Sequence, residues 1–290
     1  MKKFIVILGV IAVSFSSIFV LMSSASGFVM AFYRMAFSAI AMIPIALIKD
    51  FGVIKKMTGK EWLLSVLSGV FLGAHFALYF TSLSYTSVTA CTCLIDMEAV
   101  FVPVIMSVFF RARQGFKRWI AIAVALGGAL VLTFSRSGAE GFGMLGNILA
   151  LLAGLSVSVY TVLGNICRRD ISTAVYTAIV YTSASVTALI ACLCAGESIF
   201  DVTGGDILAG LALAGVCTLL GHSVFSWGLK YESPVFISTV KLLEPVFATA
   251  LAVIIIKGER LPGLQTFIGA ALVIAGTVFY SLCKEKSRHK

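Results

Sequence analysis

Ten stretches of about 20 predominantly apolar residues follow one another along the chain, and they constrain the fold more than any other feature. A helix of about 20 apolar residues can cross the ~30 Å hydrocarbon core of a bilayer. Short loops join the stretches, and no segment is long enough for a soluble domain. The sequence therefore predicts an all-α membrane protein with ten transmembrane helices, at residues 4–22, 27–48, 62–81, 87–110, 117–135, 143–165, 172–195, 206–229, 234–256 and 262–283.

The composition leads to the same class of protein. Apolar residues make up 60% of the chain and charged residues 12%, whereas about 25% of a soluble domain is charged. A disordered chain and a soluble enzyme are excluded by this balance. A net charge of +9 is explained below by membrane topology, and no nucleic-acid partner is predicted.

The first stretch admits a second interpretation. Lys2 and Lys3, the apolar run from Phe4, and the small residues 23–26 resemble a secretory signal peptide with its cleavage site. Cleavage would leave nine helices and remove the internal symmetry described below. We therefore expect the stretch to be retained as the first helix.

Basic residues favour one orientation in the membrane. If the N-terminus lies inside, most of the 22 Lys and Arg fall in inner loops, and the outer loops hold Arg136, Lys257 and Arg260. Lys and Arg concentrate in cytoplasmic loops and contact lipid headgroups there. We expect a multi-pass protein of the cell membrane with both termini in the cytoplasm.

The two halves of the chain resemble each other. A shift of 147 residues places His75 on His222, and a shift of 146 places Glu98 on Glu244. The halves, 1–138 and 139–290, each hold five predicted helices, so the second half enters the membrane in the opposite orientation. Two inverted five-helix repeats around a central cavity are typical of secondary transporters.

A motif in the second half makes a family resemblance specific. The motif reads Lys241-Leu-Leu-Glu244-Pro245-Val246-Phe247, Lys257-Gly258-Glu259-Arg260-Leu261, Gln265-Thr-Phe-Ile-Gly269 and Gly276. With these residues the chain resembles the ten-helix EamA-type carriers of the drug/metabolite transporter superfamily, which implies a cavity lined by helices one to four and six to nine, with the fifth and tenth at the periphery. In the first half, Ala99 stands where this family often has proline, and Arg111-Ala112-Arg113 lacks a match to Glu259.

Five formally charged residues fall well inside predicted helices. They are Arg34, Asp96, Glu98, Lys241 and Glu244. Charges in membrane helices are costly, and they usually face a cavity and pair. Similar depths, at 1.5 Å of rise per residue, suggest an Arg34–Asp96 pair with a structural role. Asp96 and Glu98, about 200° apart on an ideal helix, should face different points.

Glu98 and Glu244 are the leading candidates for a substrate or proton site. Both lie near the predicted midplane, where low dielectric disfavours the ionised form of a carboxyl, so each could carry a proton or receive a cationic group. An alternative is that Lys241, three residues from Glu244 and on the same face, neutralises it in a static pair.

The histidines are the next candidates. We expect His75 nearer the outer side of the membrane and His222 nearer the inner side, where they could gate the pathway or relay protons. Tyr79, one turn from His75, and Phe225, near His222, could surround a cation, although core packing explains them as well.

The predicted function is secondary transport of a small polar organic metabolite or drug by alternating access. The resemblance implies export, and the buried carboxyls suggest coupling to protons. A membrane-embedded enzyme and a channel are the alternatives. No cofactor is predicted, since no G-x-x-x-x-G-K-[ST] phosphate loop occurs. No metal site is predicted either, and the expected partners are the substrate, the lipid bilayer and, at most, a second copy of the chain.

Overall fold

The computed structural model describes residues 2–111, 115–133, 143–256 and 263–283. Within these residues the backbone is helical apart from short turns, and no strand is present. Helices cover most of each stretch that the sequence predicts to cross a membrane. The expectation of an all-α fold is therefore confirmed for the described part of the chain.

In the first half, two of the predicted stretches are divided, and a short helix follows the second stretch. The helices are α1 (Lys2–Ser14), α2 (Ser16–Leu21), α3 (Gly27–Lys49), α4 (Phe51–Lys56), α5 (Gly59–Ser82), α6 (Val88–Ile95), α7 (Glu98–Phe110) and α8 (Phe116–Thr133).

In the second half, one long stretch passes through a π-helix, named η1, and another is divided at its middle. The helices are α9 (Gly143–Cys167), α10 (Thr173–Cys194), α11 (Gly204–Ala212), η1 (Leu213–His222), α12 (Ser223–Gly228), α13 (Pro234–Lys241), α14 (Glu244–Ile255) and α15 (Leu264–Leu282).

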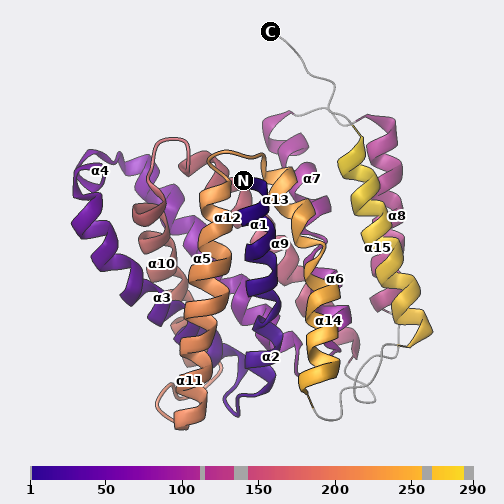
Figure 1. Ribbon diagram of the computed structural model, residues 1–290, viewed down its shortest axis with the longest axis horizontal. Coiled ribbons are helices and arrows are strands. Elements are labelled where there is room, and N and C mark those ends of the chain that lie inside the picture. The colour runs from indigo at the N-terminus through magenta and orange to yellow at the C-terminus, as the bar shows by residue number, and fades with distance from the viewer. Residues whose placement is uncertain (1, 112–114, 134–142, 257–262, 284–290) are drawn as a thin grey trace.

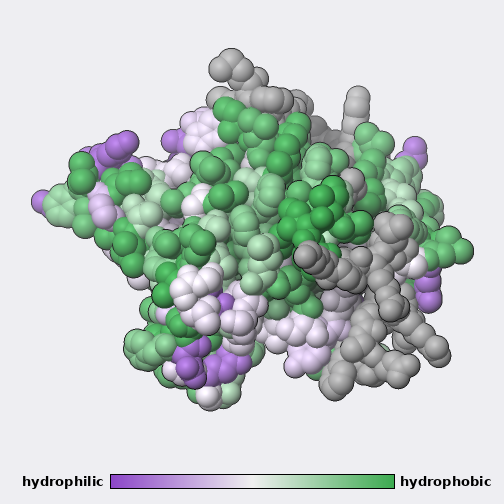
Figure 2. Space-filling view, turned by 60° about the horizontal axis from the view of Figure 1, so that its bottom comes forward, coloured by the Kyte–Doolittle hydropathy of each residue, from purple (hydrophilic) through white to green (hydrophobic). Residues whose placement is uncertain are grey.

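Several helical stretches are suited to a membrane. Two shorter apolar helices accompany six that are long and apolar enough to cross it, by length and composition. Figure 2 shows hydrophobic residues over much of one face, with hydrophilic residues in separate patches. The fold fits a membrane protein, and the number of ten crossings stays a prediction. The six long stretches are Gly27–Lys49, Gly59–Ser82, Val88–Phe110, Gly143–Cys167, Thr173–Cys194 and Gly204–Gly228.

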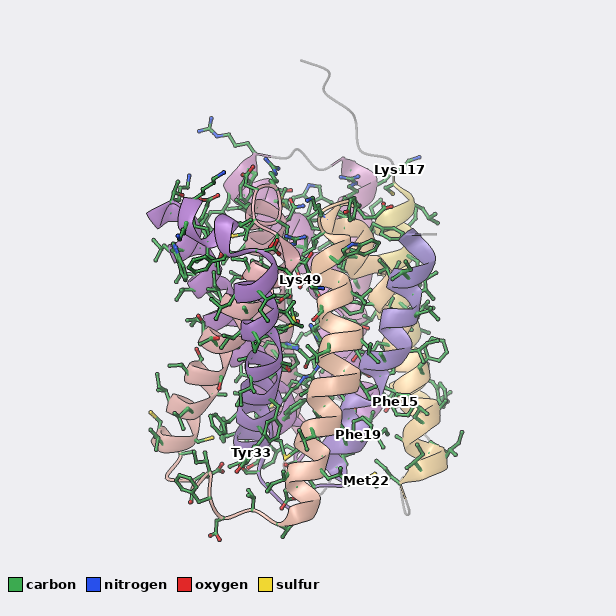
Figure 3. All side chains as sticks on the ribbon, turned by 60° about the vertical axis from the view of Figure 1, so that its left-hand side comes forward. Phe15, Phe19, Met22, Tyr33, Lys49 and Lys117 are labelled. Atoms are coloured by element: carbon green, nitrogen blue, oxygen red, sulfur yellow. The ribbon has the colours of Figure 1, made fainter. Side chains whose placement is uncertain are left out.

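Both ends of the described chain lie at the same end of the bundle. α1 begins and α15 ends toward the top of Figure 1, whereas the turn between α10 and α11 lies at the bottom. Lys49 and Lys117 lie toward the upper end in Figure 3, and Met22 lies toward the lower end. This arrangement agrees with the expectation that both termini and the basic loops lie on one side of the membrane. That this side is the cytoplasmic one stays a prediction.

Helices from the two halves pack against each other throughout the bundle. α3 packs on α10, α5 on α9, and α1 on η1 and α12. α7 packs on α13 and α6 on α14, so these divided helices cross in opposite directions (Figure 1).

α8 and α15 form a tightly packed pair at one edge of the bundle (Figure 1). A Cβ atom added at Gly128 would lie 2.6 Å from the backbone nitrogen of Val273, and one at Gly276 would lie 2.6 Å from that of Ala125. Glycine at both positions therefore permits the close approach of the two backbones, as small residues do in membrane helix pairs.

Candidate functional site

Two interrupted helices place two carboxylates at the middle of the bundle. The first stretch ends at Ile95 and resumes at Glu98, and the second ends at Lys241 and resumes at Glu244. Pro245 follows Glu244 at the start of α14, and a proline lacks the N–H that would continue the preceding helix. Each glutamate is thus the first residue of the second half of a divided helix.

A small cavity lies between these helix breaks. Its volume is about 20 Å³, enough for one water molecule. The cavity is therefore too small for an organic molecule. The lining includes every residue predicted for the site except Arg34, and it consists of Ser16, His75, Tyr79, Ile95, Asp96, Glu98, Val157, His222, Lys241 and Glu244.

Lys241 forms its ion pair with Glu98. Its Nζ lies 2.7 Å from Glu98 Oε2, and the Thr161 hydroxyl donates to Glu98 Oε1 at 2.5 Å. The alternative in which Lys241 neutralises Glu244 is therefore wrong as a direct contact. Spacing by three residues places two side chains on one face only in a continuous helix, and this helix is interrupted between them.

Glu244 lacks such a partner. Among the described residues, no hydrogen bond or ion pair to the Glu244 carboxylate is formed, and the side chain is partly exposed at the cavity. The two glutamates therefore occupy corresponding places in the sequence but differ in their surroundings. One is paired, and the other is available to a ligand.

Asp96 lines the same cavity as Glu98. An ideal helix would place the two side chains about 200° apart, but the helix is interrupted at Asp96 and Met97, and both side chains border the cavity. Asp96 Oδ2 is buried and finds no hydrogen-bond partner in the described parts of the chain. A buried polar atom of this kind usually has a water or ligand partner.

The predicted Arg34–Asp96 pair is also wrong. Arg34 donates from Nε to the Thr218 hydroxyl (2.8 Å) and from Nη1 to Ser16 (3.0 Å). The guanidinium carbon lies 3.9 Å from the centre of the Phe76 ring. Similar depth in two helices did not determine which helices are neighbours. Arg34 instead joins α3 to α2, α5 and η1 directly behind the cavity.

The two histidines meet at the cavity. Their ring centres are 6.4 Å apart, so the two side chains are close together, and their placement relative to the membrane midplane stays a prediction. Side chains in a helix tilt toward its N-terminus. α5 and the α11–α12 stretch run in opposite directions (Figure 1), and the tilt therefore carries His75 and His222 toward each other.

The hydrogen bonds of the histidines differ. His75 Nδ1 lies 3.0 Å from the carbonyl of Ala153, and because a carbonyl only accepts, His75 donates from this nitrogen. Its Nε2 is then the acceptor in the neutral ring. His222 Nδ1 is buried and unpartnered among the described residues. The cavity lining thus offers two unsatisfied atoms, one on Asp96 and one on His222.

The aromatic candidates have separate roles. Tyr79 shares a hydrogen bond of 2.8 Å with Ser17 and lies beside His75. Phe225 faces the Lys241 ammonium, 5.2 Å from the ring centre to Nζ. The cation next to Phe225 is therefore supplied by the protein itself.

Sequence reasoning missed Ser16, Thr218 and Phe76, which hold Arg34. Serine and threonine are common in membrane helices, where they usually aid packing, so spacing alone carried no signal for them. No group of three or more His, Cys, Asp or Glu side chains suited to a metal occurs within the described ranges.

Comparison with known proteins gives one consistent result. Residues 3–134 and 144–282 match the profile of the EamA-like transporter family. An uncharacterized transporter of Clostridium kluyveri is 28% identical over 254 residues, which cover 83% of this chain and 78% of that protein. One of Archaeoglobus fulgidus is 28% identical over 237 residues, with 79% of each chain covered. The uncharacterized transporter YwfM of Bacillus subtilis is 25% identical over 228 residues, covering 78% and 76%.

A solved structure shares the architecture. It is described only as a crystal structure of a protein, and it aligns with a TM-score of 0.70 at 18% identity over 99% of both chains. Identity this low shows similarity of fold alone.

Proposed function

Because the chain belongs to the EamA-like transporter family, we propose that it is a secondary transporter which moves a small polar organic solute across the cell membrane by alternating access. One observation carries the proposal. A small, charged cavity lies where two helices that run in opposite directions are both interrupted. Broken helices around a central site are typical of such carriers.

Two inverted repeats, 1–138 and 139–290, provide the means for alternating access. α6 and α13 are each eight residues long and lie 146 residues apart in the sequence, as do the first residues of α7 and α14. The family profile matches once in each half. These observations support ten crossings related by an axis in the membrane plane.

The ends of the bundle support the same relationship. Ser26 begins α3 and donates a hydrogen bond to Glu197, which follows α10. Ser172 begins α10 and donates to Asp50, which follows α3, at 2.7 Å. Each serine also accepts from the first turn of its helix. The two contacts lie at opposite ends of the bundle. In one, the first half supplies the serine and the second half the carboxylate, and in the other the reverse holds.

One further contact lacks such a counterpart. Asp206 accepts hydrogen bonds from Ser23, Ser24 and the backbone N–H of Ala25, in the turn between α2 and α3. It also forms a capping box with Thr203. At the other end, Glu61 forms the matching capping box with Thr58.

Glu61 has no other hydrogen bond among the described residues. In the proposed mechanism, the Asp206 contact closes the outer end. In the opposite state it breaks, and Glu61 docks on the turn between α9 and α10.

The cavity chemistry limits the solute. Glu244 offers an unpaired carboxylate, and Asp96 and His222 offer unsatisfied atoms. A solute with an amine and a second polar group fits this set. Protonation of Glu244 would release the amine, which gives a route to proton coupling and export. The family and the relatives' names favour a transporter over an enzyme.

Counterflow in proteoliposomes tests the proposal. Proteoliposomes loaded with unlabelled amine-containing metabolites should take up labelled solute transiently and saturably. A thermal-shift screen selects the solutes, because a ligand that binds the folded state raises apparent stability. Flux that rises without saturation and lacks counterflow would identify a channel and contradict the proposal.

A further inference from the structure

An apolar groove opens on the side of the bundle between α3, α4, α5 and α10. Its volume is about 340 Å³. Ala46 and Ala178 are buried at its floor, and its walls include Ile43, Leu47 and Trp62, which are about 40–50% exposed. The groove shares no lining residue with the charged cavity.

The groove runs from the end of the bundle toward its middle. Leu47 lies two residues before the end of α3, and Val66 lies seven residues after the start of α5. At about 1.5 Å per residue, Val66 is ~10 Å below the helix end and Thr182 of α10 is ~14 Å below it. This direction and depth match an acyl chain that descends from the headgroup level.

Four exposed lysines lie on α3, α4 and α5 at the end of the bundle where the groove begins. Lys49 ends α3, Lys55 and Lys56 end α4, and Lys60 lies in the first turn of α5. Lys55 Nζ lies 4.8 Å from the centre of the Phe51 ring. Each lysine lies one or two residues along the chain from a residue that lines the groove.

The acidic residues nearby are engaged elsewhere. Asp50 accepts from Ser172, and Glu61 accepts from the hydroxyl and backbone N–H of Thr58. These neutral donors leave both carboxylates charged, but four lysines outnumber them, so the opening has an excess of positive charge. Basic residues at this level attract anionic lipids, and a tryptophan such as Trp62 is typical of the same interface.

We propose that this groove binds one acyl chain of an anionic glycerophospholipid, whose phosphate group lies against Lys55 and Lys56. The charge at the opening selects the headgroup, and the apolar walls hold the chain. This lipid site lies on the lateral surface of the bundle, separate from the proposed solute pathway.

Fluorescence of Trp62 tests the proposal directly, because Trp62 lines the groove. Trp119→Phe and Trp227→Phe leave Trp62 as the single tryptophan. The protein is reconstituted in phosphatidylcholine vesicles that contain brominated phosphatidylglycerol or, at the same mole fraction, brominated phosphatidylcholine. We expect the anionic lipid to quench Trp62 several-fold more effectively. Equal quenching by the two lipids would overturn the proposal.

Charge variants separate a site from general attraction to a basic surface. Lys55→Gln with Lys56→Gln should lower the relative affinity for phosphatidylglycerol, by about five-fold per lysine. Lys117→Gln removes the same charge at the same end of the bundle but on α8 (Figure 3), and it should leave the preference unchanged. A preference that survives the double variant, or that falls equally with Lys117→Gln, would contradict the site.

Discussion

Lys241 and Glu98 form a buried ion pair of 2.7 Å between two divided helices, one from each half of the chain. Lys241 thereby joins the beginning of α7 to the end of α13. Its spacing of three residues from Glu244 had suggested that carboxylate as its partner. The pair instead leaves Glu244 unoccupied at the cavity, so the two glutamates should respond differently to substitution.

Removal of Lys241 should destabilise the protein more than removal of the whole pair. Lys241→Met leaves Glu98 buried without its counter-charge, and breaking a buried pair in this way costs about 3–5 kcal/mol. The double variant Lys241→Met, Glu98→Gln should recover much of the loss. The midpoint of thermal unfolding in detergent measures both. A Lys241→Met midpoint within one or two degrees of the parent protein would contradict a structural role for the pair.

Glu244→Gln should have the opposite profile. No hydrogen bond or ion pair among the described residues holds this carboxylate, so the unfolding midpoint should stay close to that of the parent protein. Counterflow should fall by at least ten-fold, and any pH dependence of transport should flatten. Asp201→Asn, at an exposed position between α10 and α11, serves as the control. Full transport with an unchanged pH profile in Glu244→Gln would remove Glu244 from the site.

Arg34→Lys tests whether the guanidinium shape is required. Arginine donates from several nitrogens in one plane and stacks on aromatic rings, whereas lysine is a point charge. The variant keeps the charge but loses the contacts to Thr218 and Ser16 and the stacking on Phe76. We expect transport to fall several-fold with a lower unfolding midpoint. Arg169→Lys, which lies in the exposed turn after α9, should change neither measurement.

Asp206→Asn should open the end of the bundle where α2 meets α11. The asparagine keeps the shape but loses charge-assisted hydrogen bonds to Ser23 and Ser24, which are stronger than neutral ones. Ser16→Cys, in the cavity lining, reports on opening through its reaction with a membrane-impermeant thiol reagent, in a background with Cys194→Ser. We expect the rate of modification from the outer side to rise several-fold.

Glu61→Gln provides the matched control for this experiment. It alters the corresponding capping box at the opposite end, so modification of the thiol introduced by Ser16→Cys should not rise from the outer side. Equal rates in the Asp206→Asn and Glu61→Gln variants would mean that the Asp206 contact does not close the outer end.

Much of the site could be predicted from the sequence, but its pairings could not. Rare charges in apolar stretches identified Glu98, Lys241 and Glu244, because such residues have to face a cavity. The pairing of Lys241 with Glu98 depends on which helices are neighbours and on the breaks before Glu98 and Glu244. Sequence spacing gives the depth of a residue in its own helix, but it predicts neither which helices are neighbours nor where a helix is interrupted.

The fold, too, could be predicted only in part from the sequence. Apolar length predicted where the helices lie, and α6–α7 and α13–α14 occupy the expected stretches. The meeting of His75 with His222 was not predicted, because depth was counted along the backbone without the tilt of the side chains. The offset of 147 residues between them nevertheless identified the two histidines as a related pair.

The π-helix η1 lies where the spacing between matched residues of the two halves changes. The capping boxes that begin α5 and α11 are 145 residues apart, and the histidines are 147 apart. The second half therefore contains two additional residues between these points. A π-helix closes its hydrogen bonds over five residues rather than four, so it accommodates additional residues within a similar length. An insertion could thus be tolerated in this half while His222 remained opposite His75.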